Sequence, residues 1–264
     1  MHYLGKMTLI ALLSLSGISM AAEKLAAPAF TPEQEARIGE VSKGYLLAHP
    51  EVLLEVSQKL QALQQEKRVQ DMTAAVIHNQ TALLMDGGSP SVGSKTAKVT
   101  IVEFFDYQCI YCARLAPEVE RAIKANPDVR FVFKEWPIFG QRWEASSQAA
   151  RVGLQIWQQK GADAYLVYHN ALFSTGHNEG KLTVGDISEA AKAAAFDWTK
   201  AADVQGTLEE TNGLAQLLGF TGTPALVVMP STGADMQNVI VIPGMAGAEV
   251  LQVAIEKAGK SSAH

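Results

Sequence analysis

The chain has 264 residues, of which 48% are hydrophobic and 19% are charged, and its formal net charge is −5 at pH 7. This length is sufficient for one substantial hydrophobic core with a smaller appended region. The acidic balance argues against nucleic acid or an anionic membrane surface as the main partner, because both attract basic proteins.

Residues 1–22 have the parts of a secretory signal peptide. Lys6 gives a positive start, residues 7–18 are apolar, and Ala21 and Ala22 offer small residues for cleavage. The apolar stretch is far shorter than the ~20 residues of a membrane-spanning helix, so cleavage is favoured over anchoring. Because Lys6 is the only charged residue of this segment, the exported chain would carry a net charge of −6. We therefore expect a periplasmic protein.

Helices are predicted over the next region, residues 23–86. Thr31 followed by Pro32 is a typical helix start, and His49 before Pro50 ends that helix near residue 48. Residues 51–86 contain no Gly or Pro and are rich in Leu, Gln, Glu and Lys, which predicts one long helix.

The long helix carries a narrow apolar stripe on an otherwise polar surface. Its members are Leu53, Val56, Leu60 and Leu63, followed after a phase slip by Val69, Met72, Val76 and Leu83. Such a stripe predicts a partner helix, so residues 23–86 are interpreted as an oligomerisation region, a homodimer with a trimer as the alternative. The other interpretation is packing on the protein's own globular domain. A Gly/Ser/Pro-containing linker at residues 87–97 favours the oligomer.

The globular domain is predicted to occupy residues 98–264. The expected strands lie at 99–105, 129–134, 225–229 and 239–242, and helices follow at 109–125 and 247–258. Residues 141–218 form a mostly helical insertion, with its last helix at 198–218. This order predicts the α/β class, with a central sheet and a helical insertion.

Cys109 and Cys112 are the only cysteines of the chain, and they form a C-x-x-C sequence at the start of a predicted helix. Two adjacent cysteines build no disulfide framework, and so small a loop restricts the unfolded chain little. Unpaired N–H groups and the dipole at the helix N-terminus favour the Cys109 thiolate, the species that attacks disulfides. The pair therefore predicts a redox-active dithiol.

A metal site is not expected at this pair. Structural zinc takes four ligands, and the two cysteines have no histidine close to them in sequence. Copper(I) bound by the reduced pair is the alternative, because soft thiolates suit this ion.

A family resemblance rests on residues 103–112, EFFDYQCIYC, and on the later sequence GTPA at residues 222–225. These motifs resemble the DsbA, DsbC and DsbG thiol–disulfide oxidoreductases of the thioredoxin superfamily, and most of all the oligomeric branch of Com1, DsbA2 and ScsC proteins. The resemblance covers residue 31 to the end. It implies a thioredoxin fold with a helical insertion after an N-terminal helical oligomerisation segment, and no cofactor besides a redox-active Cys109–Cys112 disulfide.

The resemblance also implies roles for the dithiol. Cys109 would be the exposed nucleophile and Cys112 the resolving thiol, while Ile110 and Tyr111 would tune the pair and contact substrate. Tyr111 occupies the place of a histidine in strongly oxidising members, as in isomerase-like members. A neutral phenol stabilises a thiolate less than an imidazolium does, so the pKa of Cys109 should be lowered, though less than in the best oxidases.

Four further residues are assigned by their positions. Pro224 matches the family's cis-proline, which would place the Thr223 backbone against the dithiol to pair with substrate main chain. Glu103 would lie beneath the disulfide with a raised pKa and shuttle the proton of Cys112; an edge-exposed glutamate is the alternative. Lys134 could neighbour Glu103 as a tentative relay residue; a solvated lysine at a strand end is the alternative.

These residues predict an exported thiol–disulfide interchange enzyme with an isomerase bias. Its substrates would be unfolded or misoxidised secreted proteins, and its redox partner a membrane thiol reductase or oxidase. One alternative is a dithiol oxidase that introduces disulfides. The other is a copper-handling or chaperone-like binding protein.

Overall fold

The structure is a computed structural model that describes residues 29–85 and 87–260. Its contacts divide the chain into two compact units, Met1–Gln58 and Lys59–His264, which are described separately below. The expected signal peptide, residues 1–22, lies outside the described residues. Within the described ranges, every helix is too short or too polar to cross a membrane.

The first unit contains helix α1, Pro32–Ala48. Thr31 and Gln34 form a capping box at its start, in which each side chain accepts the backbone N–H of the other residue. None of its residues is buried. The larger apolar side chains of α1 are therefore open to solvent: Ile38, Val41, Tyr45, Leu46 and Leu47.

Helix α2, Glu51–His78, extends from the first unit into the second. The predicted stripe is divided along it. Leu53, Val56, Leu60 and Leu63 are each more than half exposed. In contrast, Met72 and Val76 are buried in the core of the second unit.

The long helix ends earlier than the predicted residue 86. Asn79 interrupts it, and its side-chain amide donates to the Ala75 carbonyl at 2.8 Å. An Asn side chain that binds the preceding turn in this way competes with the helical backbone. The short helix α3, Gln80–Leu84, then follows.

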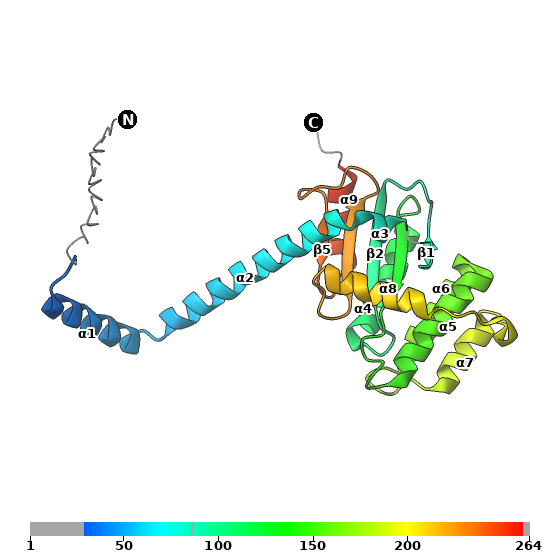
Figure 1. Ribbon diagram of the computed structural model, residues 1–264, viewed down its shortest axis with the longest axis horizontal. Helices are drawn as coiled ribbons and strands as arrows, with labels where there is room; N and C mark the ends of the chain where they lie inside the picture. The colour runs from blue at the N-terminus through cyan, green and yellow to red at the C-terminus, as the bar shows by residue number, and fades with distance from the viewer. Residues whose placement is uncertain (1–28, 86, 261–264) are drawn as a thin grey trace, which may run out of the picture. The chain divides into compact units, whose positions relative to one another are not determined.

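Within the described residues, five strands form one mixed sheet in the order β1-β3-β2-β4-β5 (Figure 1). Strand β2 is central, parallel to β3 and antiparallel to β4. The strands are β1 Ser91–Val92, β2 Val99–Phe105, β3 Arg130–Glu135, β4 Ala225–Pro230 and β5 Ile240–Ile242.

The boundary predicted at residue 98 differs from the division in the structure. Part of the expected linker, residues 87–97, forms the edge strand β1, in which Ser91 pairs with Val132 and Val92 with Phe131. The second unit begins at Lys59 instead. The reason is that the end of α2 and α3 supply apolar side chains that cover one face of the sheet.

Helices cover both faces of the sheet (Figure 1). One face packs against α4 Ile110–Ala125, α9 Ala248–Gly259 and the insertion helices α5 Glu144–Lys160, α6 Ala162–Ser174 and α7 Val184–Ala193. The other packs against α8 Gln205–Leu217, α3 and the end of α2.

The last helix predicted in the insertion, 198–218, is divided in two. A short 3-10 turn, Trp198–Lys200, precedes α8. Between them the Asp203 carboxylate accepts the Gln205 N–H at 2.9 Å, a local contact that competes with the helical backbone.

Candidate active site

Asp106 shapes the turn that joins the central strand to α4. One of its carboxylate oxygens accepts the Gln108 N–H at 2.8 Å. The other accepts the Phe139 N–H at 2.9 Å and the Ser146 hydroxyl at 2.7 Å. The Asp106 carbonyl accepts the Cys109 N–H at 3.0 Å. This network fixes where α4 begins. An aspartate in a turn is a signal that the sequence carries, and its role here was not predicted.

Both cysteines are free thiols in this structure. Cys109 is the N-cap of α4 and Cys112 lies in its first turn. A hydrogen bond from Cys112 lowers the pKa of Cys109 to about 6, with further help from the N–H groups of Cys112 and Tyr111, against the opposing effect of burial. Burial and the neighbouring Cys109 raise the pKa of Cys112 well above its ordinary value. Cys109 is therefore the thiol that ionises first.

The loop before β4 lies against the dithiol. The Thr223–Pro224 peptide bond is cis. The Thr223 carbonyl oxygen is 3.3 Å from Cys109 Sγ. Strand pairing holds the loop there, because Ala225 pairs with Phe104 of β2.

Cys109 is covered more than the sequence predicts. The residue is only 3% exposed, rather than an exposed nucleophile. Besides Thr223, a loop of the helical insertion lies beside it. In that loop the Glu179 N–H donates to the Gln108 carbonyl at 2.9 Å and the Gly180 N–H to Gln108 Oε1 at 2.8 Å. The insertion therefore contributes directly to the surroundings of the dithiol.

Glu103 is buried in the central strand and is 3% exposed, which excludes the edge-exposed alternative. Burial raises its pKa from 4.5 to about 8. One of its carboxyl oxygens has no hydrogen-bond partner. Its charge also contributes to the raised pKa of Cys112. The carboxyl is therefore within electrostatic range of the buried thiol.

The predicted neighbourhood of Lys134 and Glu103 is wrong. Glu103 pairs with Phe133 across the two parallel strands, and Lys134 pairs with Phe104. Paired residues share a face and successive residues alternate, so the two side chains lie on opposite faces of the sheet. Lys134 is 2% exposed, so it is not a solvated lysine either, and its Nζ lies 3.5 Å from the Ala82 carbonyl of α3.

Residues 100–256 match the model of the DSBA-like thioredoxin domain. The chain belongs to this family. Its members are thiol–disulfide oxidoreductases, and the predicted thioredoxin fold with a helical insertion is confirmed. Residues 34–67 of this DsbA-like chain match a second model, the copper resistance protein ScsC N-terminal domain.

Solved structures agree with this assignment. BcfH of Salmonella enterica Typhimurium is 43% identical, with a TM-score of 0.77 over 86% of this chain and 97% of that chain. The catalytic domain of Proteus mirabilis ScsC is 29% identical, with a TM-score of 0.60 over 71% of this chain and 98% of that chain. The predicted resemblance to the ScsC branch is confirmed.

A curated relative, disulfide bond formation protein D of Bacillus subtilis, is 30% identical over 90 residues, which are 33% of this chain. The chain spans at most 39% of the length of the curated relatives it matches.

Glu135, at the end of β3, is a second buried carboxyl of the DsbA-like domain that the sequence analysis missed. It is 1% exposed, and Oε1 accepts the hydroxyls of Tyr107 at 3.0 Å and Tyr165 at 2.8 Å. Burial raises its pKa well above the ordinary value. Gly153 of α5 leaves room for it, because a Cβ there would lie 2.6 Å from Oε1. The residues of this cluster are far apart in sequence and follow no local pattern, so only the three-dimensional structure brings them together.

Ile110 and Tyr111 differ in their surroundings. Ile110 is partly buried, and its N–H donates to Glu179 Oε1 at 3.3 Å. Tyr111 is 53% exposed, with the Arg114 guanidinium 5.8 Å from its ring centroid. The phenol is therefore available to a substrate at the surface.

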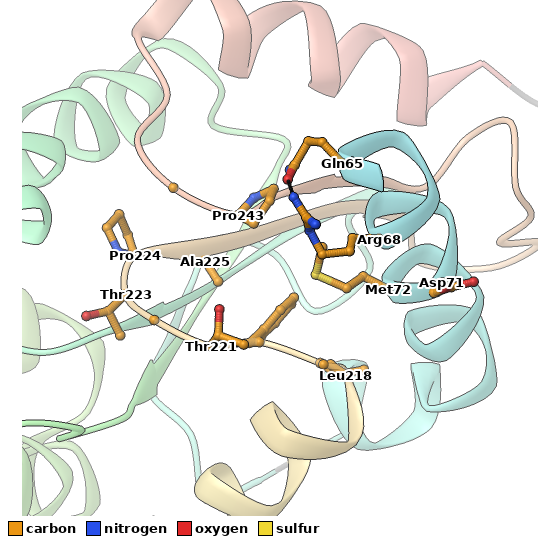
Figure 2. A pocket seen from close by; sticks show the side chains of 14 residues that line it. Gln65, Arg68, Asp71, Met72, Leu218, Thr221, Thr223, Pro224, Ala225 and Pro243 are labelled. Carbon is orange, nitrogen blue, oxygen red and sulfur yellow. Dashed lines mark hydrogen bonds between the residues drawn. The ribbon is translucent and has the colours of Figure 1, made fainter. Parts of the chain in front are cut away.

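A groove of about 580 Å³ begins at Thr223 and Pro224 and reaches the end of α2 (Figure 2). The loop 218–223 and Pro243 line it on one side, and α2 lines the other. Figure 2 shows Arg68 directed into this space, where its guanidinium donates to the Gln65 side chain at 2.5 Å. The groove thus combines backbone groups, apolar surface and a cation, and Thr223 at its start contacts Cys109.

A resident metal site is not evident in the described part of the chain. Among those residues, no group of three or more His, Cys, Asp or Glu side chains is placed to hold an ion.

Proposed function

We propose that this DsbA-like protein is an exported thiol–disulfide interchange enzyme that isomerises, and also forms, disulfides in secreted proteins. The carrying observation is the position of Cys109, the thiol of lowered pKa, 3.3 Å from the Thr223 carbonyl. A nucleophilic sulfur beside a backbone segment that can pair with an extended chain suits a disulfide in an unfolded protein.

The first step is attack by the Cys109 thiolate on one sulfur of a substrate disulfide. A bond forms between Cys109 and that sulfur, the substrate S–S bond breaks, and the second substrate sulfur leaves as a thiolate. In isomerisation, another substrate thiolate attacks the mixed disulfide. This restores the Cys109 thiolate and leaves a rearranged substrate disulfide, with no net redox change.

Cys112 provides the second route by which the mixed disulfide is resolved. It attacks the Cys109 sulfur, a Cys109–Cys112 disulfide forms, and the substrate leaves with its disulfide reduced by two electrons. The proton of Cys112 must leave first, and the ionised fraction of Glu103 is the proposed acceptor. The reverse sequence oxidises a substrate dithiol. A membrane thiol reductase or oxidase is the proposed partner that resets the dithiol, and no other cofactor is proposed.

An isomerase bias is proposed from the chemistry of Cys109. Its pKa of about 6 is lowered from 9.0, but it lies above the ~3.5 of the strong oxidant DsbA. A less stabilised thiolate makes the disulfide less oxidising. Tyr111, a neutral residue before Cys112, supports the same interpretation.

The groove of Figure 2 is the proposed site for substrate chain beside the scissile disulfide. A strand that pairs with the Thr223 backbone would extend along it toward α2. Arg68 would then favour acidic side chains near the reacting cysteine.

Self-association is proposed for the exposed apolar side chains of α1 and the first part of α2, such as Val41, Leu47, Leu53 and Val56. Burying such side chains against a second copy is favourable. A homodimer is proposed, with a trimer as the alternative. Export to the periplasm is proposed from the signal-type pattern of residues 1–22.

Two assays test this proposal. The first measures reactivation of scrambled ribonuclease in a glutathione buffer, and the second measures oxidation of reduced ribonuclease. An isomerase reactivates the scrambled enzyme, and the Cys112→Ala variant accumulates mixed disulfides with it. A dedicated oxidase accelerates only the second assay. In cells, acid quenching and maleimide tagging would show a mostly reduced dithiol for the isomerase and a mostly oxidised one for the oxidase.

Copper binding is the second candidate, favoured by the match of residues 34–67 to a copper resistance protein domain. Two thiolates are suitable ligands for copper(I). The test is competition for copper(I) with a chromophoric chelator. Binding that survives replacement of both cysteines by serine would exclude the dithiol as the ligand.

A further inference from the structure

The helical insertion places a carboxylate at the start of the catalytic helix. Glu179 Oε1 accepts the N–H of Ile110, the residue directly after Cys109, at 3.3 Å. Ile110 is the first residue of α4. Its N–H is one of the unpaired groups at a helix N-terminus that stabilise negative charge. Glu179 therefore brings a carboxylate to the N–H of the residue next to Cys109, at the same helix end as the Cys109 thiolate.

The position of Glu179 is fixed by the loop that carries it. Its own N–H and that of Gly180 both bind Gln108, which is 1% exposed. Glu179 has a φ of +53°, a conformation that non-glycine residues rarely adopt. Two hydrogen bonds to Gln108 in the turn before the helix, and one from the Ile110 N–H, thus hold a strained residue with its carboxylate toward α4.

The charge of Glu179 acts on the same turn. It contributes to the raised pKa of Asp106, whose main cause is burial. An anion at this site also opposes the formation of a second anion on Cys109, because like charges at one helix end repel.

Other ionisable groups around Cys109 come from each neighbouring element. Cys112 is in the same helix, and Arg114 stacks on Tyr111. From β2 and the turn come Glu103 and Asp106, and His177 of the insertion loop pairs with Asp186. Glu179 differs from them because it binds the N–H next to the nucleophile.

We propose that Glu179 is a positioning residue that limits stabilisation of the Cys109 thiolate and so holds the dithiol at a less oxidising poise. This inference rests on the proposed dithiol function and assigns part of the isomerase bias to the helical insertion. The insertion thereby tunes the chemistry of a helix from which Glu179 is 69 residues distant in sequence.

The test is the pKa of Cys109 in the full-length Glu179→Gln variant, read from thiolate absorbance at 240 nm against pH. Glutamine keeps an oxygen for the Ile110 N–H but removes the charge. We expect the pKa to fall by about 0.5 unit, the size expected for two solvent-screened charges. The glutathione equilibrium should shift about threefold toward the dithiol, about 14 mV at 29.6 mV per tenfold.

Two comparisons separate charge from structure. Glu179→Ala should lower the pKa at least as much, and Glu189→Gln, on the exposed α7 residue whose side chain is 78% exposed, should not change it. In 1 M salt the difference between wild type and Glu179→Gln should shrink, because the screening length is then about 3 Å. Thermal unfolding verifies that each variant is folded.

An unchanged or raised pKa in Glu179→Gln, with the variant folded, would overturn the proposal. So would a lowered pKa that is insensitive to salt. None of these measurements uses a substrate protein. A failure in scrambled-ribonuclease reactivation would therefore count against the proposed function and not against the role of Glu179.

Discussion

The two ends of helix α2 carry apolar side chains at similar spacing but lie in different surroundings. At the first end Leu53 is 56% exposed, whereas Val76 near the second end is 0% exposed and packs on the sheet. The second end also supplies Arg68 and Met72 to the groove beside the dithiol. An apolar stripe on a helix thus predicts a packing partner. Only the fold shows whether that partner belongs to the same chain.

The largest expected effect is the loss of disulfide interchange when Cys109 is replaced. This loss should leave self-association through the first end of α2 unchanged. Replacing Cys109 by Ala should reduce disulfide interchange by at least about a thousandfold, because the low-pKa nucleophile is lost. Self-association, measured by analytical ultracentrifugation, should not change. Appreciable residual reactivation of scrambled ribonuclease would contradict the assignment of Cys109.

Aspartate introduced at either end of α2 should have different consequences. Val76→Asp buries an unpaired carboxyl and should lower the free energy of unfolding by about 4 kcal/mol or more. Leu53→Asp should leave the unfolding of the catalytic unit within about 0.5 kcal/mol but weaken self-association. Urea unfolding and sedimentation measure the two effects. If both variants lowered the free energy of unfolding equally, the two ends of α2 would be equally buried, contrary to the comparison above.

Removing a buried carboxyl and removing an exposed one should change the pH dependence of the free energy of unfolding differently. The pKa of Glu103 is raised to about 8 in the folded protein. Its protonation therefore contributes stability that is fully present below pH 4.5 and is lost as pH rises through about 8. In Glu103→Gln the fall in stability between pH 5 and 8 should be smaller by up to about 1.4 kcal/mol per pH unit.

The control for this prediction is Glu55→Gln, at the exposed first end of α2. This variant should show the wild-type dependence of urea unfolding on pH. If Glu103→Gln also matches wild type, the carboxyl is not protonated in the folded state near neutral pH.

The smallest expected effect concerns the groove at the second end of α2. Arg68→Glu should slow the reaction with disulfide peptides that carry acidic residues beside the cysteine by about two- to fivefold, and speed it for basic ones. Lys59→Glu reverses a charge on the same helix outside the groove. Stopped-flow rates with paired peptides measure both. An effect equal for both peptides would remove Arg68 from substrate recognition.

Much of the fold follows from local signals in the sequence. Capping at Thr31, the strand before Cys109 and the apolar runs of β3 and β4 all identify elements within a few residues of their ends. The division of α2 did not follow, since helical periodicity is the same whether a helix packs in its own domain or on a second chain. The strand at Ser91 was missed because two residues carry no period.

The site was predictable where it is continuous in sequence or carried by a motif. The dithiol, Glu103 and Pro224 belong to such segments. Lys134 was misplaced because the side of a strand that a residue faces depends on register with its neighbour. Glu135 contacts Tyr165 of α6, and Glu179 of the insertion loop contacts Ile110 of α4; both contacts depend on tertiary packing.

Gly153 has a consequence for how this sequence can vary in nature. Alanine would ordinarily stabilise a helix interior by up to about 1 kcal/mol. Here the added methyl would lie 2.6 Å from Glu135 Oε1 and 3.3 Å from a ring carbon of Tyr168. A lineage that gains a larger residue at this position must also change the buried carboxyl or its tyrosine neighbours. Substitutions at positions 135, 153 and 168 should therefore occur together among relatives of this protein.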